Sequence, residues 1–138
     1  MSVHFLSHDL TWATPQGVFD ELNKEFGFTL DPCCSKETTK CKKYYTLQNN
    51  GLLHSWEGER IFMNPPYGRQ IPKWIEKAYT ESKKGMTIVV CLIPSRTDTK
   101  WWHDYVMKAN EIRFIKGRLK FGNSKNNAPF PSAIVVFN

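Results

Sequence analysis

One stretch of the sequence limits the fold more than any other. Residues 87–93 read TIVVCLI and are almost entirely apolar, and the run lies between Gly85 and Pro94. A short apolar run without alternation predicts a strand buried on both faces, as in a parallel sheet covered by helices. The rest of the chain must therefore supply helices for both faces of this strand.

Apolar residues at helical spacing predict three helices. The first begins near Thr14, which is expected to cap it, and ends at Gly27. The second lies within residues 71–85, and the third is expected to be capped by Thr97 or Asp98. Strands are expected at residues 28–31, 44–46, 60–63, 87–93, 111–115 and 132–137. This alternation predicts a compact α/β fold with a mostly parallel central sheet flanked by helices.

Length, charge, apolar runs and cysteine spacing add four expectations. The whole chain, residues 1–138, suits one domain with one hydrophobic core. Its 19 basic and 13 acidic side chains give a net charge of +6, which favours a polyanionic partner such as DNA or RNA. No apolar run approaches the roughly 20 residues that span a bilayer, and residues 1–10 do not resemble a signal peptide, so we expect a cytoplasmic protein without a membrane partner. The four cysteines lack the spacing of metal ligands, and no metal site is expected.

The most informative motif is Asn64-Pro65-Pro66-Tyr67. It directly follows the predicted strand 60–63, at the carboxyl end where parallel α/β sheets bind ligands. Asn-Pro and Pro-Pro also occur in ordinary turns. The position at a strand end and the aromatic residue that follows favour a functional site over a simple turn.

The chemistry of these four residues suits methylation of an exocyclic amine. Such an amine is a poor nucleophile, because its lone pair is delocalised into the ring. Two acceptors on its N–H bonds would direct the lone pair toward an incoming methyl group, and the Asn64 side-chain oxygen and the Pro65 carbonyl can supply them. Pro66 has no competing N–H, and Tyr67 can stack on the base. A base within a duplex would have to flip out to reach this site.

Six motifs give the chain a resemblance to a known family. They are Trp12-Ala13-Thr14-Pro15, Phe28-Thr29-Leu30-Asp31-Pro32, Asn64-Pro65-Pro66-Tyr67-Gly68, Pro94-Ser95-Arg96-Thr97-Asp98-Thr99, Gly117-Arg118-Leu119-Lys120-Phe121 and Ala128-Pro129-Phe130-Pro131-Ser132. The chain resembles the phage-type DNA N-6-adenine-methyltransferases over residues 12–137. The resemblance implies a Rossmann-like fold that uses S-adenosylmethionine (SAM), a double-stranded DNA substrate, and a phage or prophage protein in a bacterial host.

The resemblance also implies the cofactor site. Thr14 and Pro15 are similar to the segment that touches the methionine end of SAM, and Asp31-Pro32 to the motif whose carboxylate receives its ammonium group. One departure is that no Gly-rich turn follows Pro32. The SAM pocket is therefore either reduced or completed by a second subunit, and the oligomeric state stays open. Glu37 is a weak candidate for the ribose hydroxyls.

Basic residues near two of the motifs are candidates for DNA contacts. Arg118 and Lys120 lie in a Gly/Asn-rich loop with Phe121, and Arg96 follows the buried strand. We expect the cations to meet phosphates and, by analogy with other adenine methyltransferases, Phe121 to face the flipped base opposite Tyr67. The alternatives are that Phe121 lies in the core and that Arg96 pairs with Asp98.

Three other functions remain open from the sequence. A methyltransferase acting on RNA adenine or on a protein glutamine would present the same kind of amino group to the motif. A small nucleic-acid-binding module could keep the fold and lose SAM. A zinc-dependent nuclease fits least well, because its ligands would be poorly spaced.

Overall fold

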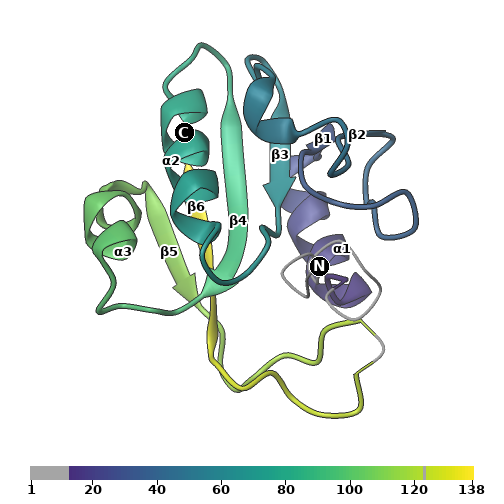
Figure 1. Cartoon of the computed structure of the whole chain (residues 1–138), viewed down its shortest axis with the longest axis vertical. Coiled ribbons are helices and arrows are strands. Elements are labelled where there is room, and N and C mark those ends of the chain that lie inside the picture. The colour runs from purple at the N-terminus through teal and green to yellow at the C-terminus, as the bar shows by residue number, and fades with distance from the viewer. Residues whose placement is uncertain (1–12, 123) are drawn as a thin grey trace.

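The computed structural model describes residues 13–122 and 124–138 (Figure 1). Residues 1–12, which include Trp12 of the first motif, lie outside the described part. Within it the helices are α1 (Gln16–Phe26), α2 (Ile71–Ser82) and α3 (Lys100–Asp104), with short 3-10 turns at η3 (Gly51–Leu53) and η4 (Val106–Lys108). The strands are β1 (Leu30–Asp31), β2 (Lys43–Tyr44), β3 (Arg60–Met63), β4 (Ile88–Pro94), β5 (Glu111–Phe114) and β6 (Ser132–Phe137).

These strands form one mixed sheet in the order β2-β1-β3-β4-β6-β5. The four strands β2-β1-β3-β4 pair in parallel, and β6 runs antiparallel to both of its neighbours. The expectation of a mostly parallel sheet is therefore confirmed in part, because the sheet is mixed. β5 and β6 pair antiparallel because they are joined by a loop without a helical crossover, and a parallel pair needs such a crossover.

The predicted strand at residues 87–93 occupies the middle of the sheet as β4. Its residues from Val89 to Ile93 are fully buried, as the apolar run indicated. Helices α2 and α3 cover one face, on which Trp74, Ile75 and Trp102 pack against β3, β4 and β6. Helix α1 and the loop at residues 115–131 cover the other face through Phe19, Leu22, Phe121 and Phe130.

One helix end agrees with the expectations, and two helix caps differ from them. Gly27 does end α1, in a left-handed conformation with φ 64°. Thr14 does not cap α1, because Pro15 occupies the cap position and the Thr14 hydroxyl is used elsewhere. Thr99, and not Thr97 or Asp98, caps α3 by accepting a 3.3 Å hydrogen bond from the Trp102 backbone N–H. Among the described residues, no helix has the length and apolar character needed to span a membrane.

Candidate active site

Three parallel strands bring the predicted site residues to one edge of the sheet. Asp31 is the last residue of β1, Asn64 follows β3, and Pro94 ends β4. The register pairs Leu30 with Ile61 and Met63 with Cys91, so these ends lie side by side. A narrow hollow at this edge is lined by Ala13, Thr14, Asp31, Cys33, Cys34, Thr38 and Asn64. The structure therefore brings Thr14, Asp31 and Asn64 together, although they are far apart in the sequence.

Both the side chain and the backbone carbonyl of Asn64 take part in hydrogen bonds. The Nδ2 of Asn64 donates a 3.0 Å hydrogen bond to the Thr14 hydroxyl, and the residue is 8% exposed. This bond directs the amide nitrogen toward Thr14 and turns the Oδ1 end away from it. The Cys33 thiol donates to the Asn64 carbonyl over 3.4 Å. The side-chain oxygen of Asn64 is thus set in a fixed direction at the strand end.

Asp31 is a buried carboxylate, only 5% exposed. Its Oδ2 accepts a 3.3 Å hydrogen bond from the Lys40 backbone N–H. Burial raises the pKa of the Asp31 carboxyl from 3.8 to about 6, and the backbone donors at Lys40 and Cys33 oppose the rise only in part. A carboxylate with this desolvation cost is suited to receive a cationic group, because an ammonium partner would restore favourable electrostatics.

Tyr67 packs within an aromatic cluster formed with Phe121 and Phe130. Its ring meets Phe121 edge-on, with centroids 5.9 Å apart at 88°, and Phe130 at 5.3 Å and 83°. Phe121 is 2% exposed. The rings of Tyr67 and Phe121 are in contact and perpendicular, so no base fits between them in this conformation. The structure therefore favours the alternative in which Phe121 belongs to the core and supports Tyr67 from the side.

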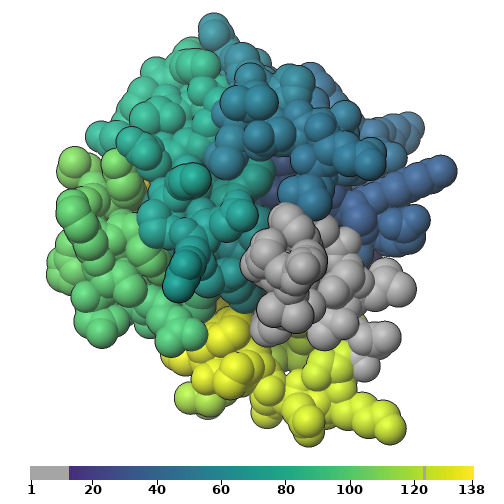
Figure 2. All heavy atoms as spheres, in the orientation of Figure 1, coloured from purple at the N-terminus to yellow at the C-terminus, as the bar shows by residue number. Residues whose placement is uncertain are grey.

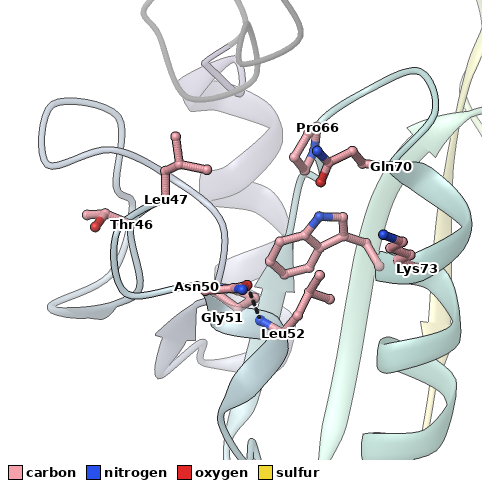
Figure 3. Close-up of a pocket in the computed structure, with 10 residues that line it drawn as sticks. Thr46, Leu47, Asn50, Gly51, Leu52, Pro66, Gln70 and Lys73 are labelled. Carbon is pink, nitrogen blue, oxygen red and sulfur yellow. Dashed lines mark hydrogen bonds between the residues drawn. The ribbon is translucent and has the colours of Figure 1, made fainter.

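A larger pocket, of about 250 Å³, borders the Asp31-Pro32 and Asn64-Pro65-Pro66 segments at Pro32 and Pro66. Its lining residues are Pro32, Thr46, Leu47, Asn50, Gly51, Leu52, Pro66, Gln70, Lys73 and Trp74. Figure 3 shows Pro66 and Gln70 on one side of this pocket and Asn50, Gly51 and Leu52 on the opposite side. Pro32 is the residue after Asp31, and Pro66 is the second residue after Asn64. The pocket and the narrow hollow are therefore lined by residues of the same two turns.

Gly51 is a site residue that the sequence interpretation did not assign, although Asn50-Gly51 was visible as a turn signal. A Cβ at this position would lie 2.1 Å from the Pro32 carbonyl oxygen. The η3 turn can approach the Asp31-Pro32 turn only because residue 51 has no side chain.

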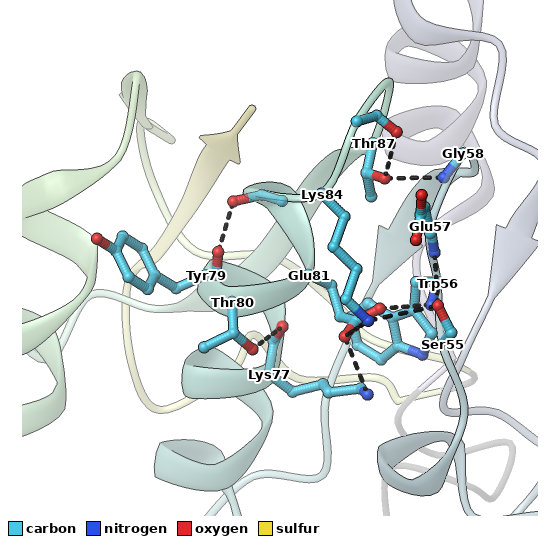
Figure 4. A network of polar contacts seen from close by, with 12 residues as sticks. Ser55, Trp56, Glu57, Gly58, Lys77, Tyr79, Thr80, Glu81, Lys84 and Thr87 are labelled. Carbon is cyan, nitrogen blue, oxygen red and sulfur yellow. Dashed lines mark hydrogen bonds and ion pairs between the residues drawn. The ribbon is translucent and has the colours of Figure 1, made fainter.

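Buried Trp56 fixes the η3 turn, and a polar network fixes Trp56 (Figure 4). Its Nε1 donates to the Gly51 carbonyl over 3.0 Å, and its backbone N–H donates to a Glu81 oxygen. Lys84 and Lys77 pair with Glu81 at 2.7 and 3.3 Å. Burial alone would raise the pKa of the Glu81 carboxyl, but these partners hold it below its ordinary value. This network is structural, and it keeps one wall of the pocket in place.

The cationic candidates lie on the surface around the aromatic cluster. Arg118 and Lys120 are both exposed, in the loop at residues 115–131 that forms the lower edge of the molecule in Figure 2. Gly122 N–H donates to the Ala13 carbonyl over 2.8 Å, which ties this loop to the segment before α1. The Arg96 guanidinium lies 5.7 Å from the Phe130 ring centre. Within the described ranges no ion pair joins Arg96 to Asp98.

The Asn64-Pro65-Pro66-Tyr67 turn follows a parallel strand and lies beside the buried carboxyl of Asp31, which is the arrangement that the resemblance to amino-group methyltransferases implied. A model of the DNA N-6-adenine-methyltransferase (Dam) family matches residues 5–136, and the chain belongs to this family. The family expected from the sequence motifs is thereby confirmed.

Relatives of this chain include two phage proteins. It is 35% identical over 117 residues to the DNA N-6-adenine-methyltransferase of Haemophilus phage HP1 (strain HP1c1), covering 83% of this chain and 67% of that protein. It is 30% identical over 110 residues to the protein of the same name from Escherichia phage T1, covering 78% of this chain and 45% of that protein. The chain thus spans less than half of the T1 protein. A putative methyltransferase YfdM of Escherichia coli (strain K12) is 41% identical over 64 residues, which cover 41% of this chain and 69% of that protein.

Proposed function

We propose that the chain transfers a methyl group from SAM to the exocyclic N6 amine of an adenine that has flipped out of double-stranded DNA. Family membership supports adenine N6 as the acceptor. The observation that carries the proposal is the amide of Asn64 at the strand end, because Thr14 fixes its nitrogen and its side chain lines the same narrow hollow as the buried Asp31.

The acceptor amine is oriented by two oxygens. The Asn64 Oδ1 accepts one N6–H and the Pro65 carbonyl accepts the other, which directs the nitrogen lone pair toward the methyl group. The Thr14 hydrogen bond would hold the Asn64 amide in one orientation for this role. No strong base is needed, since the product nitrogen loses its proton after transfer.

The donor would bind across the two hollows that border the Asp31-Pro32 turn. Asp31 would receive the ammonium group, with Thr14 in the same narrow hollow and Pro15 next to Thr14 in the sequence. Pro32 and Pro66 would contact the nucleoside in the pocket of about 250 Å³. SAM, when bound, supplies an electrophilic methyl group on a sulfonium. The residues present fit this group, because a buried carboxylate and a mixed polar and apolar pocket lie next to each other.

The DNA would approach from the side of the aromatic cluster. Tyr67 would stack on the flipped adenine, with Phe121 and Phe130 holding its ring in place. Arg96, Arg118 and Lys120 would contact phosphates, which position the duplex without reading its sequence. The loop that carries Arg118 and Lys120 is anchored through buried Phe121, so these cations are held near the site.

The broader architecture fits this function. Five of the six strands run in one direction, and the site lies at their carboxyl ends, as in Rossmann-like folds. We place the activity in the cytoplasm of a bacterial host, where the DNA of a phage or prophage is found.

A competition between acceptors tests this function. The protein is incubated with SAM carrying a radiolabelled methyl group and with duplex DNA, structured RNA or a glutamine-containing protein. We expect label in DNA alone, recovered after digestion as N6-methyladenine. Label in RNA or protein, or at cytosine, would overturn the proposed acceptor.

A further inference from the structure

Trp74 carries a buried N–H that the fold does not satisfy. The side chain is 4% exposed and lines the pocket of about 250 Å³. Its Nε1 has no hydrogen-bond acceptor within residues 13–122 and 124–138. Buried donors are nearly always paired in native proteins. An unpaired donor in the wall of a pocket points to an acceptor on a bound ligand.

The neighbouring indole of Trp56 differs from that of Trp74, because its N–H has an acceptor. Trp56 and Trp74 stack with ring centres 6.3 Å apart and an interplanar angle of 19°. The Nε1 of Trp56 donates to the Gly51 carbonyl, whereas that of Trp74 has no such partner in the described part of the chain. Because Trp56 is held by Gly51 and Glu81, it gives the Trp74 ring a rigid support. The position of the Trp74 N–H is therefore set before any ligand binds.

We propose that the indole N–H of Trp74 donates a hydrogen bond to the nucleoside part of the methyl donor. An indole N–H is a donor only, and the acceptors that a nucleoside offers it are the ring nitrogens of adenine and the ribose oxygens. The polar side chains of this pocket include the amides of Asn50 and Gln70 and the amine of Lys73, and no carboxylate is among its ten described lining residues. This inference rests on the proposed function, and it assigns part of the recognition of the nucleoside to the uncharged indole N–H.

Trp74 can be observed directly by NMR of the full-length protein labelled with 15N-tryptophan. The chain has five tryptophans, and Trp74→Phe identifies the indole signal of residue 74 by its loss. The probe is 5′-methylthioadenosine, which has the nucleoside and the thioether of SAM but no amino acid. We expect the Trp74 indole proton to shift downfield on binding. The Trp101 signal serves as the control, because this residue lines a groove between α2 and α3 and is not among the residues that line the pocket.

Affinity supplies the second measurement. Replacement of Trp74 by benzothienylalanine keeps the bicyclic shape and removes only the N–H. We expect calorimetry to show about 5- to 30-fold weaker binding of 5′-methylthioadenosine, as loss of one hydrogen bond to a fixed donor predicts. Trp101→Phe should bind as tightly as the original protein.

The outcomes separate this inference from the proposed function. If the original protein binds 5′-methylthioadenosine and SAM but the Trp74 signal does not move and the benzothienylalanine variant binds equally well, the inference is wrong and the function stands. If the original protein binds neither compound, the methyltransferase proposal fails, and the inference fails with it.

Discussion

The Nδ2 of Asn64 donates a 3.0 Å hydrogen bond to the hydroxyl of Thr14, fifty positions earlier in the sequence. Asn64 follows a central strand, and Thr14 precedes the first helix. This one contact joins the proposed catalytic amide to the segment expected to touch the methyl donor. Orientation of the acceptor amine and binding of the donor are thereby linked through a single hydroxyl.

Substitution of Thr14 tests this link. Thr14→Val keeps the shape of the side chain and removes the acceptor, so the Asn64 amide can rotate. We expect kcat to fall about 10-fold, the effect of roughly 1–2 kcal/mol of lost orientation. Thr14→Ser retains the hydroxyl and should recover most of the rate in a single-turnover methylation assay. Equal rates for the valine and serine variants would contradict the link.

The buried carboxyl of Asp31 predicts a pH dependence of donor binding. Its pKa of about 6 lies above the ordinary 3.8, so burial destabilises the folded state increasingly as the pH rises from 4 through 6 and the group ionises. Only the ionised form attracts an ammonium group. We expect the affinity for SAM to fall up to about tenfold per pH unit below 6 and to level off above it.

Calorimetry between pH 5 and 7.5 checks this expectation, with 5′-methylthioadenosine as the control ligand. That compound carries no ammonium group, so its affinity should change little over the same range. Loss of both affinities together at low pH would indicate that the fold, and not the Asp31 carboxylate, responds to pH.

Addition of a single methyl group at residue 51 is expected to lower both the stability of the protein and its affinity for SAM. In Gly51→Ala the new Cβ would lie 2.1 Å from the Pro32 carbonyl oxygen, so the η3 turn must move away from the donor site. We expect the free energy of unfolding to fall by about 1–3 kcal/mol and SAM to bind at least ten times more weakly. Chemical denaturation and calorimetry measure the two effects.

Gly17→Ala is the matched control for Gly51→Ala. Gly17 lies within α1, and a Cβ there meets nothing within 4 Å. We expect this variant to be more stable by about 0.5–1 kcal/mol, because alanine favours a helix over glycine. A Gly51→Ala protein that binds SAM normally would show that the close approach to Pro32 is not required.

The exposed cations Arg118 and Lys120 lead us to expect that the affinity for DNA depends on salt concentration. Arg118→Ala with Lys120→Ala should raise the KM for DNA and reduce the slope of log affinity against log salt by about 1 for each phosphate that is no longer neutralised. Filter binding at several salt concentrations measures the slope. Lys83→Ala is the control, because Lys83 follows α2 at the opposite end of the sheet from the site and lies over the Tyr79 ring. Equal slopes for both variants would remove Arg118 and Lys120 from the interface.

Local sequence patterns predicted much of the fold. The apolar run at residues 87–93 indicated β4, and the spacing of Ile71, Trp74 and Ile75 indicated α2. Strand ends at Asp31, Asn64 and Pro94 placed the site at one edge of the sheet. These features depend on periodicity and on residues that end strands, which are visible within a short window.

Features that depend on distant contacts could not be predicted in this way. The use of the Thr14 hydroxyl by Asn64, and the close approach of Gly51 to Pro32, join segments about 50 and 20 positions apart, and no local pattern encodes them. The same holds for the support of Tyr67 by Phe121. Helical spacing predicts that Trp74 lies in the core, and it is buried there, but only the structure shows that its ring also borders a pocket.

Substitution of Asn64 tests the central claim most directly. The amide oxygen of Asn64 is proposed to orient the adenine N6 amine, whereas the donor is held by other residues. Asn64→Ala should therefore bind SAM within a fewfold of the original affinity by calorimetry and form no N6-methyladenine in duplex DNA, measured by mass spectrometry of digested DNA. N6-methyladenine formed by Asn64→Ala at the original rate would contradict the account.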